Sequence, residues 1–286
     1  MISTHPYLAI DLGGSNTRLG LFSSLGTPAF TALDGFPTRS SYKAQLESIL
    51  AVLREQGVAH LAGAGVSVAA RVARDGQSIV FGPNLPNYLH QPLAADLEAS
   101  LGCPVRLGHD TVCGLLGEKR FGVLQAVERC AYLTLSTGTG AAIQLGKDGT
   151  ALTSSIEIGH QILDGNELLC LCGQVGCLET FTGGRQLELR YGRPIAEVAD
   201  AAFWQVFASK LALGLLNLAQ LTRLDAVAVS GAIALQNAFL IALVQEKIDA
   251  LLKGSSLQLL PAELGAHAPL VGAASLLAVP ESTILH

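Results

Sequence analysis

The sequence is poor in charge, and the charge it carries forms no basic patch. Only 14% of the 286 residues are Asp, Glu, Lys or Arg, whereas 50% are hydrophobic. A chain with this much apolar material and this little charge is expected to fold rather than to stay disordered. The formal net charge of −5 and the lack of any Lys/Arg cluster argue against nucleic acid as a ligand.

Sequence signals for a membrane span, for export and for a P-loop are also missing. No uninterrupted apolar run reaches the roughly 18 residues of a membrane helix, so no membrane association is expected. The first residues lack a basic segment followed by an apolar one, so we expect no signal peptide and a cytoplasmic protein. In that reducing compartment, six cysteines favour free thiols or a metal site over disulfides. No Gly-x-x-x-x-Gly-Lys-Ser/Thr motif occurs.

Strands and helices alternate along the chain, which is typical of an α/β protein. Buried strands are expected at residues 7–12, 18–22, 63–68, 104–107, 131–135, 141–145 and 226–229. Helices are expected at about residues 42–55, 93–101, 111–120, 210–221 and 270–279.

A strand–glycine turn–strand pattern occurs twice, around Asp11–Thr17 and again around Ser136–Gly140. This recurrence suggests two lobes of related topology. We expect a small first lobe at residues 1–110, completed by a C-terminal helix at 270–286, and a larger second lobe at 111–269. Because no low-complexity linker separates them, the hinge is expected near Asp110–Thr111 and in the last helix.

The two glycine turns have the composition of a phosphate-binding site. Glycines let the backbone approach an anion closely and point N–H groups at it, and hydroxyl side chains add donors. Asp11, at the end of the first strand, is a group that holds Mg²⁺ directly or through its waters. The candidate residues are Gly13, Gly14, Ser15, Asn16 and Thr17 in the first turn, and Thr137, Gly138 and Thr139 in the second. An ordinary tight hairpin has the same glycines, so one turn alone supports either interpretation.

Four nitrogen and sulfur groups close together in the sequence predict a structural zinc site. They are His160, Cys170, Cys172 and Cys177. Three thiols and an imidazole complete a tetrahedral shell and leave no open position, so the ion would build structure rather than activate water. The alternatives are buried free thiols, or a disulfide between the last two cysteines. The remaining three, Cys103, Cys113 and Cys130, lie singly in apolar surroundings that suit core packing.

Polar side chains beside the cysteines suit a sugar. A loop held by zinc would bring Glu157, His160 and Glu179 to one rim, where carboxylates and an imidazole can pair with hydroxyls. If one nitrogen of His160 binds the metal, the other is available to a ligand. The alternative is that the two glutamates are solvated or only support the loop.

Asp110 and Asn84 each have a functional and a purely structural interpretation. Asp110 ends a strand and precedes a helix, so it can accept the proton of an attacking hydroxyl in phosphoryl transfer, or it can cap the helix. Asn84 lies in the rigid loop Gly82–Tyr88, which can be a sugar loop or only a turn.

Taken in order, these stretches resemble the ROK family of sugar kinases and sugar-responsive repressors. Asp11–Thr17 and Ser136–Gly140 match its two phosphate motifs, and Asn84-Leu85-Pro86 matches a sugar-loop motif. Glu157–His160 and Cys170–Glu179 match its signature, which is the most specific of the matches.

The resemblance implies the two-lobed, actin-like ATPase fold of hexokinases, each lobe a mixed sheet with flanking helices. It also implies ATP between the lobes, a hexose in the cleft and a homodimer. In this family pattern Asp110 is the base, and the sugar is bound by Asn84, Glu157, His160 and Glu179.

The sequence departs from the family pattern at three places. His109 stands where the family usually has Asn immediately before the base, and we expect it to face the sugar and to alter which epimer fits. Ala69-Ala70 stand where Pro-Gly is common. The glycine pair on the adenosine side is reduced to Ser230-Gly231-Ala232, which leaves Gly231 to contact adenine or ribose.

The expected function is ATP-dependent phosphorylation of a hexose at its primary hydroxyl, with glucose the first choice of substrate and an N-acetylated hexosamine the second. The main alternative is a non-catalytic sugar-binding regulator. The family's repressors carry a DNA-binding module before the kinase-like part, and a first strand at Tyr7 leaves no room for one. Asp11 and Asp110 together favour an enzyme. A zinc-dependent hydrolase would need an open coordination position.

Overall fold

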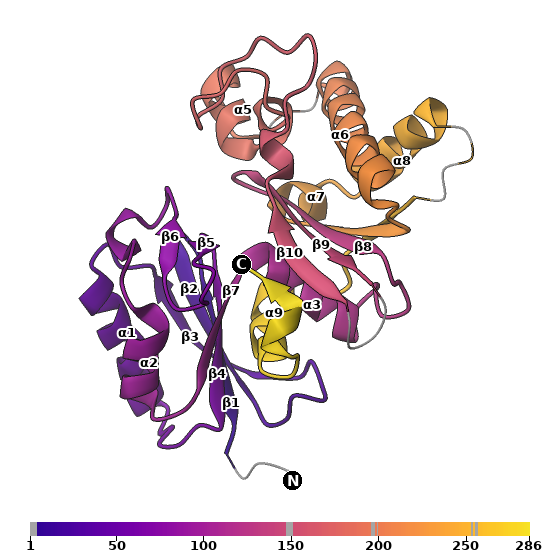
Figure 1. The fold of residues 1–286 in the computed structure, drawn as a ribbon. Helices are drawn as coiled ribbons and strands as arrows, with labels where there is room; N and C mark the ends of the chain where they lie inside the picture. Colours follow the sequence, from indigo (N-terminus) through magenta and orange to yellow (C-terminus); the bar gives the residue numbers. More distant parts are fainter. Residues whose placement is uncertain (1–4, 147–150, 196–197, 199, 253, 255–256) are drawn as a thin grey trace. The chain divides into compact units, whose positions relative to one another are not determined.

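The structure, a computed structural model, describes residues 5–146, 151–195, 198, 200–252, 254 and 257–286. The chain divides into two compact units, Met1–Phe121 with His267–His286, and Gly122–Ala266 (Figure 1). Helix α3 (Asp110–Phe121) thereby belongs to the first unit. The hinge near residues 110–111 and the lobe boundaries expected from the sequence stay predictions.

Five strands form the main sheet of the first unit. Their spatial order is β3 (Thr31–Pro37), β2 (Asn16–Phe22), β1 (Tyr7–Leu12), β4 (Gly63–Val68) and β7 (Val105–His109). β1, β4 and β7 run parallel, and β2 and β3 are antiparallel additions. β4 is buried along its whole length, as expected of a central parallel strand with both faces covered. A small ribbon of β5 (Arg71–Val72) and β6 (Ile79–Phe81) precedes the 3₁₀ turn η1 (Pro86–Tyr88).

Helices cover both faces of this sheet (Figure 1). α1 (Tyr42–Glu55) and α2 (Leu93–Leu101) pack on one face and contribute Ile49, Leu53 and Leu97 to its core. α1 begins where the Ser41 side chain accepts a hydrogen bond from the Ala44 N–H, which is a standard helix N-cap. On the other face lie α3 and α9 (Ala268–Leu276).

Two glycines allow α9 to touch its neighbours backbone to backbone. A Cβ on Gly272 would lie 1.6 Å from the carbonyl oxygen of Cys113 in α3, and one on Gly65 would lie 1.8 Å from that of Ala273. Side chains at either position would therefore separate α9 from α3 or from the sheet. The distances from α9 to α3 and from α9 to the sheet therefore depend on these two glycines.

Replacing Gly272 with alanine is expected to destabilise the protein by about 3 kcal/mol or more, because the methyl group has no space and both backbones must move. Thermal unfolding measures the change as a lower Tm. The matched control is Gly26→Ala, where the nearest atom to a new Cβ is the Ser24 hydroxyl at 3.4 Å. That control is expected to stay within about 0.5 kcal/mol of the parent. Equal stability of the two variants would contradict this description of α9.

The sheet of the second unit repeats the topology of the first. In space, β10 (Leu152–Ile156), β9 (Thr139–Leu145), β8 (Cys130–Leu135), β11 (Ala226–Ser230) and β12 (Gln258–Pro261) follow in this order. The pairs are antiparallel from β10 to β8 and parallel from β8 to β12, as they are from β3 to β1 and from β1 to β7. The duplication predicted from the two glycine turns is therefore confirmed at the level of topology. The α/β class with two mixed sheets is confirmed with it.

The helices of the second unit surround a core of its own. They are η3 (Ile158–His160), α4 (Glu179–Thr182), α5 (Gly184–Tyr191), α6 (Ala201–Thr222), α7 (Ala232–Gln236) and α8 (Phe239–Leu251). η5 (Gly265–His267) spans the end of this unit and the start of the segment that returns to the first unit. After α9 the chain forms η6 (Glu281–Thr283) and β13 (Ile284–Leu285).

The longest helix, α6, differs from the prediction in two ways. It begins at residue 201 instead of 210, because the Asp200 side chain caps it by accepting a hydrogen bond from the Ala202 N–H. By length and composition it is also apolar enough to cross a membrane, contrary to what the sequence suggested. Trp204, Phe207 and Leu211 on this helix are buried in the core of the second unit, which is the usual environment of an apolar helix in a folded core.

Candidate functional site

The first glycine turn connects β1 and β2 and is shorter than predicted. β2 already begins at Asn16, and the turn closes through a hydrogen bond from the Gly13 N–H to the Asn16 carbonyl oxygen (3.0 Å). A Cβ on Gly14 would lie 2.7 Å from the Cβ of Asn84. The absence of a side chain at Gly14 therefore lets the predicted sugar loop pack against the predicted phosphate turn. Ser15 and Asn16 are exposed at its tip.

Thr17 lies at the base of this turn, inside the first unit. It is fully buried, so its hydroxyl is not presented to a phosphate group. Its oxygen accepts a hydrogen bond from Gln45 (2.8 Å) and lies 3.0 Å from the Thr38 hydroxyl, which donates to the carbonyl oxygen of Gly13 (2.7 Å). This chain of hydrogen bonds braces the turn from inside the unit. The Thr17 hydroxyl thus supports the turn, and the assignment of this residue to the nucleotide site stays a prediction.

Asp11 is held by its neighbours on β2 and β4. The register places it opposite Arg18 and Ser67. Arg18 Nε donates to one carboxylate oxygen (3.0 Å), and the Ser67 hydroxyl donates to the other (3.0 Å). Burial raises the pKa of Asp11, against the opposing effect of the Arg18 guanidinium. Since both oxygens already accept hydrogen bonds, a magnesium ion would either displace these donors or reach the carboxylate through its own waters.

Asp110 and His109 lie at the same edge of the first sheet as this turn. Leu12, Val68 and His109 are in register at the carboxyl ends of β1, β4 and β7. Asp110 is the first residue of α3, and one of its carboxylate oxygens accepts a hydrogen bond from the Thr111 N–H (2.7 Å). Asp110 therefore makes a hydrogen bond at the start of the helix, as expected if it caps the helix, which was the alternative to a catalytic role. His109 Nδ1 lies 2.9 Å from the same oxygen.

The second glycine turn, between β8 and β9, is held by the segment that follows the cysteines. It closes through the Ser136 N–H and the Gly138 carbonyl oxygen (3.0 Å). The N–H groups of Gly184 and Arg185, at the start of α5, donate to the carbonyl oxygens of Ser136 and Thr137, both at 2.9 Å. A Cβ on Gly184 would lie 2.7 Å from the Ser136 carbonyl oxygen. The sequence motifs did not predict this support, although the Gly183-Gly184 pair after the cysteine signature was a usable signal.

Thr139 repeats the pattern of Thr17. It is buried, and its hydroxyl lies 2.8 Å from that of Thr182, so its contact with a nucleotide stays a prediction. Its N–H donates to Glu179 (2.8 Å). Glu179 is half-buried, and its carboxylate lies against the turn: a Cβ on Gly138 would be 2.8 Å from one of its oxygens.

The predicted sugar rim comes together in part. Glu157, at the start of η3, is exposed, and His160, at its end, is half-buried. Between them, a Cβ on Gly159 would lie 2.4 Å from the Thr139 carbonyl oxygen and 3.2 Å from Glu179. The structure therefore packs η3 and Glu179 around the start of β9.

A cavity of about 210 Å³ opens beside the second turn. Its lining residues are Ser136, Thr137, Gly184, Arg185, Glu188, Pro194, Ile195, Ala232, Ile233 and Gln236. Gly231 precedes this lining, with φ of 91°, and a Cβ there would lie 2.3 Å from the Leu135 carbonyl oxygen. Only glycine fits such a position. The polar residues Arg185, Glu188 and Gln236 were not singled out from the sequence, because nothing in it placed α5 beside α7.

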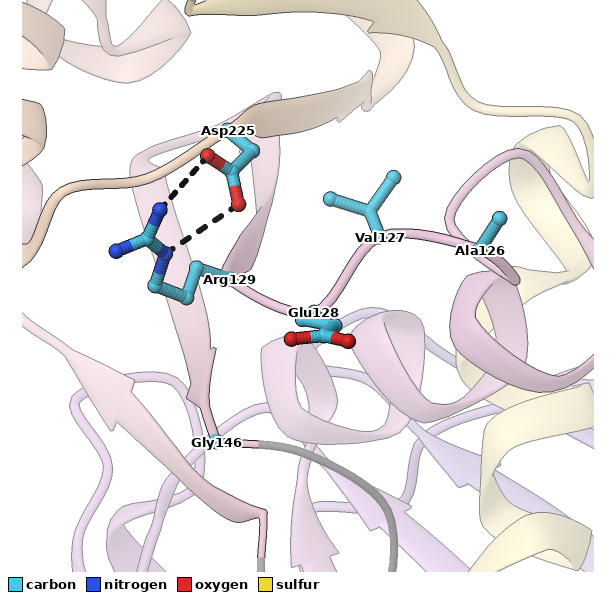
Figure 2. Close-up of a pocket in the computed structure, with 6 residues that line it drawn as sticks. All are labelled: Ala126, Val127, Glu128, Arg129, Gly146 and Asp225. Carbon is cyan, nitrogen blue, oxygen red and sulfur yellow. Dashed lines mark hydrogen bonds and ion pairs between the residues drawn. The ribbon is translucent and has the colours of Figure 1, made fainter.

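A larger cavity of about 500 Å³ lies at the opposite edge of the same sheet (Figure 2). It is formed around the amino ends of β8 and β11, where Arg129 makes an ion pair with Asp225 (3.1 Å). Both partners are exposed by more than 40%, so this pair contributes little to stability. None of the predicted site residues lines this cavity.

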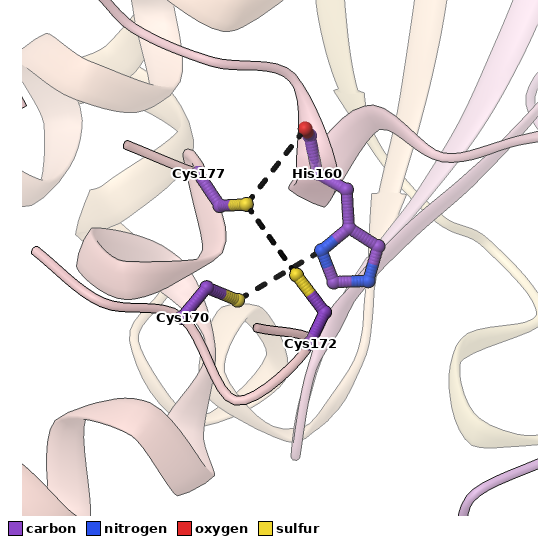
Figure 3. Close-up of side chains that lie close together, drawn as sticks. All are labelled: His160, Cys170, Cys172 and Cys177. Atoms are coloured by element: carbon purple, nitrogen blue, oxygen red, sulfur yellow. Dashed lines mark hydrogen bonds between the residues drawn. The ribbon is translucent and has the colours of Figure 1, made fainter. Parts of the chain in front are cut away.

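His160, Cys170, Cys172 and Cys177 form the predicted cluster (Figure 3). Their ligand atoms all lie within 4.8 Å of one another. The Cys172 and Cys177 sulfurs are 3.7 Å apart, and Cys170 Sγ is 3.9 Å from His160 Nδ1. Two thiolates on one tetrahedral zinc ion lie about 3.8 Å apart, so the arrangement fits that metal. All the cysteines are free thiols, which rules out the disulfide alternative in this structure.

The thiols differ in how readily they lose a proton. Burial raises the pKa of Cys170 and raises that of Cys177 to about 12. At Cys172 burial also acts to raise the pKa, but hydrogen bonds from Gln174 and from the other two thiols outweigh it and lower the pKa to about 7. A metal ion binds the thiolate form, so binding at this cluster would release protons.

The loop geometry brings the cysteines together and connects them to Glu179. Cys170 and Gly173 close a tight turn through a backbone hydrogen bond (2.9 Å), with φ of 91° at Gly173. A bridge between Ile162 and Cys177 then returns the chain to the His160 segment. Because α4 begins only two residues after Cys177, the cluster fixes the position of Glu179.

These features define a class: a two-unit α/β protein with one glycine turn in each of two related sheets and a compact His/Cys₃ cluster in the second unit. The chain belongs to the ROK family, which it matches over residues 7–279.

Its relatives include both enzymes and regulators. It is 30% identical over 188 residues to a putative xylose repressor from Caldicellulosiruptor sp. This match covers 63% of this chain and 47% of the repressor. It is 29% identical over 193 residues to the glucokinase of Streptomyces coelicolor. This match covers 65% of this chain and 58% of the glucokinase. The matches thus span only about half to three fifths of these relatives.

The fold is similar to that of a ROK family glucokinase from Streptomyces griseus, solved in complex with glucose and AMPPNP. The TM-score is 0.76 at 25% identity, and the match covers 95% of this chain and 98% of that one. The chain is therefore a ROK sugar kinase-like protein with a His/Cys cluster of the kind that binds zinc.

Proposed function

We propose that this protein is a kinase that transfers the terminal phosphoryl group of ATP to the primary hydroxyl of a hexose. The observation that carries the proposal is Asp110. It is a half-buried carboxylate at the carboxyl end of β7, on the same sheet edge as Asp11 and the first glycine turn. A general base and a phosphate turn on one edge are the parts that phosphoryl transfer requires.

In the proposed reaction Asp110 takes the proton of the attacking hydroxyl as the phosphoryl group arrives. The N–H groups at Gly14 and Gly138 bind phosphate oxygens, and the cavity beside the second turn receives the adenosine part of ATP. A magnesium ion, when bound with ATP, neutralises phosphate charge, and Asp11 would hold it through water.

The sugar is proposed to be an aldohexose, glucose first and an N-acetylated hexosamine second. Asn84, Glu157, His160 and Glu179 are the groups assigned to its hydroxyls. Sites that bond each hydroxyl discriminate strongly against sugars that lack one, because their own polar groups are then left unpaired.

Zinc is proposed to be structural, held by His160 Nδ1 and the three thiols, and to supply only a fixed frame for η3 and Glu179. His160 would present its other nitrogen to the sugar. A homodimer and a cytoplasmic location are proposed from the family resemblance and from composition alone.

The second candidate is a non-catalytic sugar-binding regulator, which the similarity to a xylose repressor favours. Such a protein would bind a sugar without turnover and would not need Asp110.

ADP release, measured over glucose, mannose, fructose, N-acetylglucosamine and N-acetylmannosamine, distinguishes the two. The kinase predicts ADP release that depends on one or more aldohexoses. A sugar that stabilises the protein against heat but releases no ADP would support the regulator, and turnover confined to a ketose would show that the substrate assignment is wrong.

A further inference from the structure

The two oxygens of the Asp110 carboxylate have different surroundings. Oδ1 accepts the hydrogen bond from the Thr111 N–H at 2.7 Å and lies 2.9 Å from His109 Nδ1. Within the described part of the chain, Oδ2 has no hydrogen-bond partner. One oxygen is thus held by the protein, and the other is left for a ligand.

The contacts of His109 Nδ1 indicate where the imidazole carries its proton. Nδ1 lies 2.9 Å from Asp110 Oδ1 and 2.8 Å from the Thr111 hydroxyl oxygen. A carboxylate oxygen can only accept, so that contact is attractive only if Nδ1 carries a hydrogen. The Thr111 hydroxyl can accept as well as donate, so it tolerates either form. An unprotonated Nδ1 would instead place two lone pairs 2.9 Å apart.

The backbone N–H of Thr111 points at both groups. It donates to Asp110 Oδ1 at 2.7 Å and, over a longer distance of 3.3 Å, to His109 Nδ1. It therefore already has the carboxylate as its acceptor and does not need a lone pair on the imidazole.

We propose that His109 is a positioning residue for the catalytic carboxylate. Its Nδ1–H and the Thr111 N–H together hold Oδ1 of Asp110, and this orients Oδ2 to accept the proton of the sugar hydroxyl. The inference rests on the proposed function, in which Asp110 is the general base. It gives His109 a role towards Asp110, whereas a contact between the other ring nitrogen and the sugar stays a prediction.

Replacing His109 with asparagine or with glutamine distinguishes the roles of its two ring nitrogens. The asparagine side-chain nitrogen takes the place of Nδ1, and the glutamine nitrogen reaches the place of Nε2. We expect His109→Asn to keep kcat within about threefold of the parent. We expect His109→Gln and His109→Ala to lower kcat by about 10- to 100-fold, since a misplaced catalytic group costs that much. The KM for the hexose is expected to change less than threefold in all three variants.

The matched control is His60→Asn. His60 is exposed and precedes β4, at the edge of the first sheet opposite Asp110, so its loss is expected to leave kcat and KM unchanged. The proposal is overturned if His109→Gln is as active as the parent while His109→Asn is not. It is also overturned if the three His109 variants change only the KM for the sugar.

A second measurement needs no substrate. Nitrogen-15 NMR of the imidazole, assigned by the signals lost in His109→Asn, is expected to show Nδ1 protonated in the parent protein. In Asp110→Ala the acceptor is gone, and the proton is expected to move to Nε2 while Nδ1 accepts from the Thr111 hydroxyl at 2.8 Å.

An unprotonated Nδ1 in the parent, or a tautomer unaffected by Asp110→Ala, overturns the proposal. If the parent phosphorylates no sugar, the proposed function fails, but the NMR result still decides whether His109 holds Asp110.

Discussion

Asp110→Asn is expected to lower kcat by about 10²–10⁴-fold, the usual contribution of a general base. The asparagine side chain cannot take up the proton of the sugar hydroxyl. It can still accept the Thr111 N–H hydrogen bond that Asp110 makes at 2.7 Å, because asparagine serves at helix starts as well as aspartate does. The variant should therefore fold with an unchanged Tm and bind the hexose about as tightly as the parent.

Steady-state kinetics and calorimetric binding of the sugar measure these two effects separately. Asp34→Asn is the matched control, because Asp34 is exposed on the outer strand β3. Normal turnover of Asp110→Asn would remove Asp110 from the mechanism. Loss of activity together with a large fall in Tm would show that its main role is at the start of α3.

Cys177→Ser is expected to abolish zinc binding and to destabilise the second unit by about 4 kcal/mol or more, which is typical of a lost structural metal. The Tm should fall by about 10 °C. Cys177 is fully buried beside Cys172 and next to the start of α4. Without the metal, the segment that carries Glu179 keeps only its backbone hydrogen bonds to the His160 loop, such as the one from the Leu178 N–H to the Gln161 carbonyl oxygen (2.9 Å).

Elemental analysis of the protein purified without chelators measures the metal, and one zinc per chain is expected in the parent. Cys103→Ala is the control, since Cys103 is a buried cysteine in the core of the first unit. A parent protein that contains no zinc, or a Cys177→Ser variant that retains it, would contradict a structural zinc site.

The sequence predicted best those parts of the fold that local chemistry determines. β1 and β4 are mostly apolar because both their faces are covered, and the bounds of both match the prediction. The three closely spaced cysteines and His160 form the expected cluster, since a short loop with glycines at the turns leaves them few other arrangements.

Other features depended on contacts that no local pattern reveals. β3 was not predicted, because it is an outer strand with mostly exposed side chains and no apolar alternation. The burial of Thr17 and Thr139 depends on Gln45 and Thr182, which come from helices far along the chain. His109 was expected to face the sugar, and only the side-chain geometry shows its Nδ1 against Asp110.

The most direct test of the proposed function is the identification of the product formed by the purified protein from ATP, Mg²⁺ and glucose. Phosphorus-31 and carbon-13 NMR show which oxygen of the sugar carries the new phosphoryl group. We expect phosphorylation at the primary hydroxyl, in an amount equal to the ADP released. The absence of any sugar phosphate with glucose and with each of the other hexoses tested, from a protein that binds one of them, would contradict the proposed function.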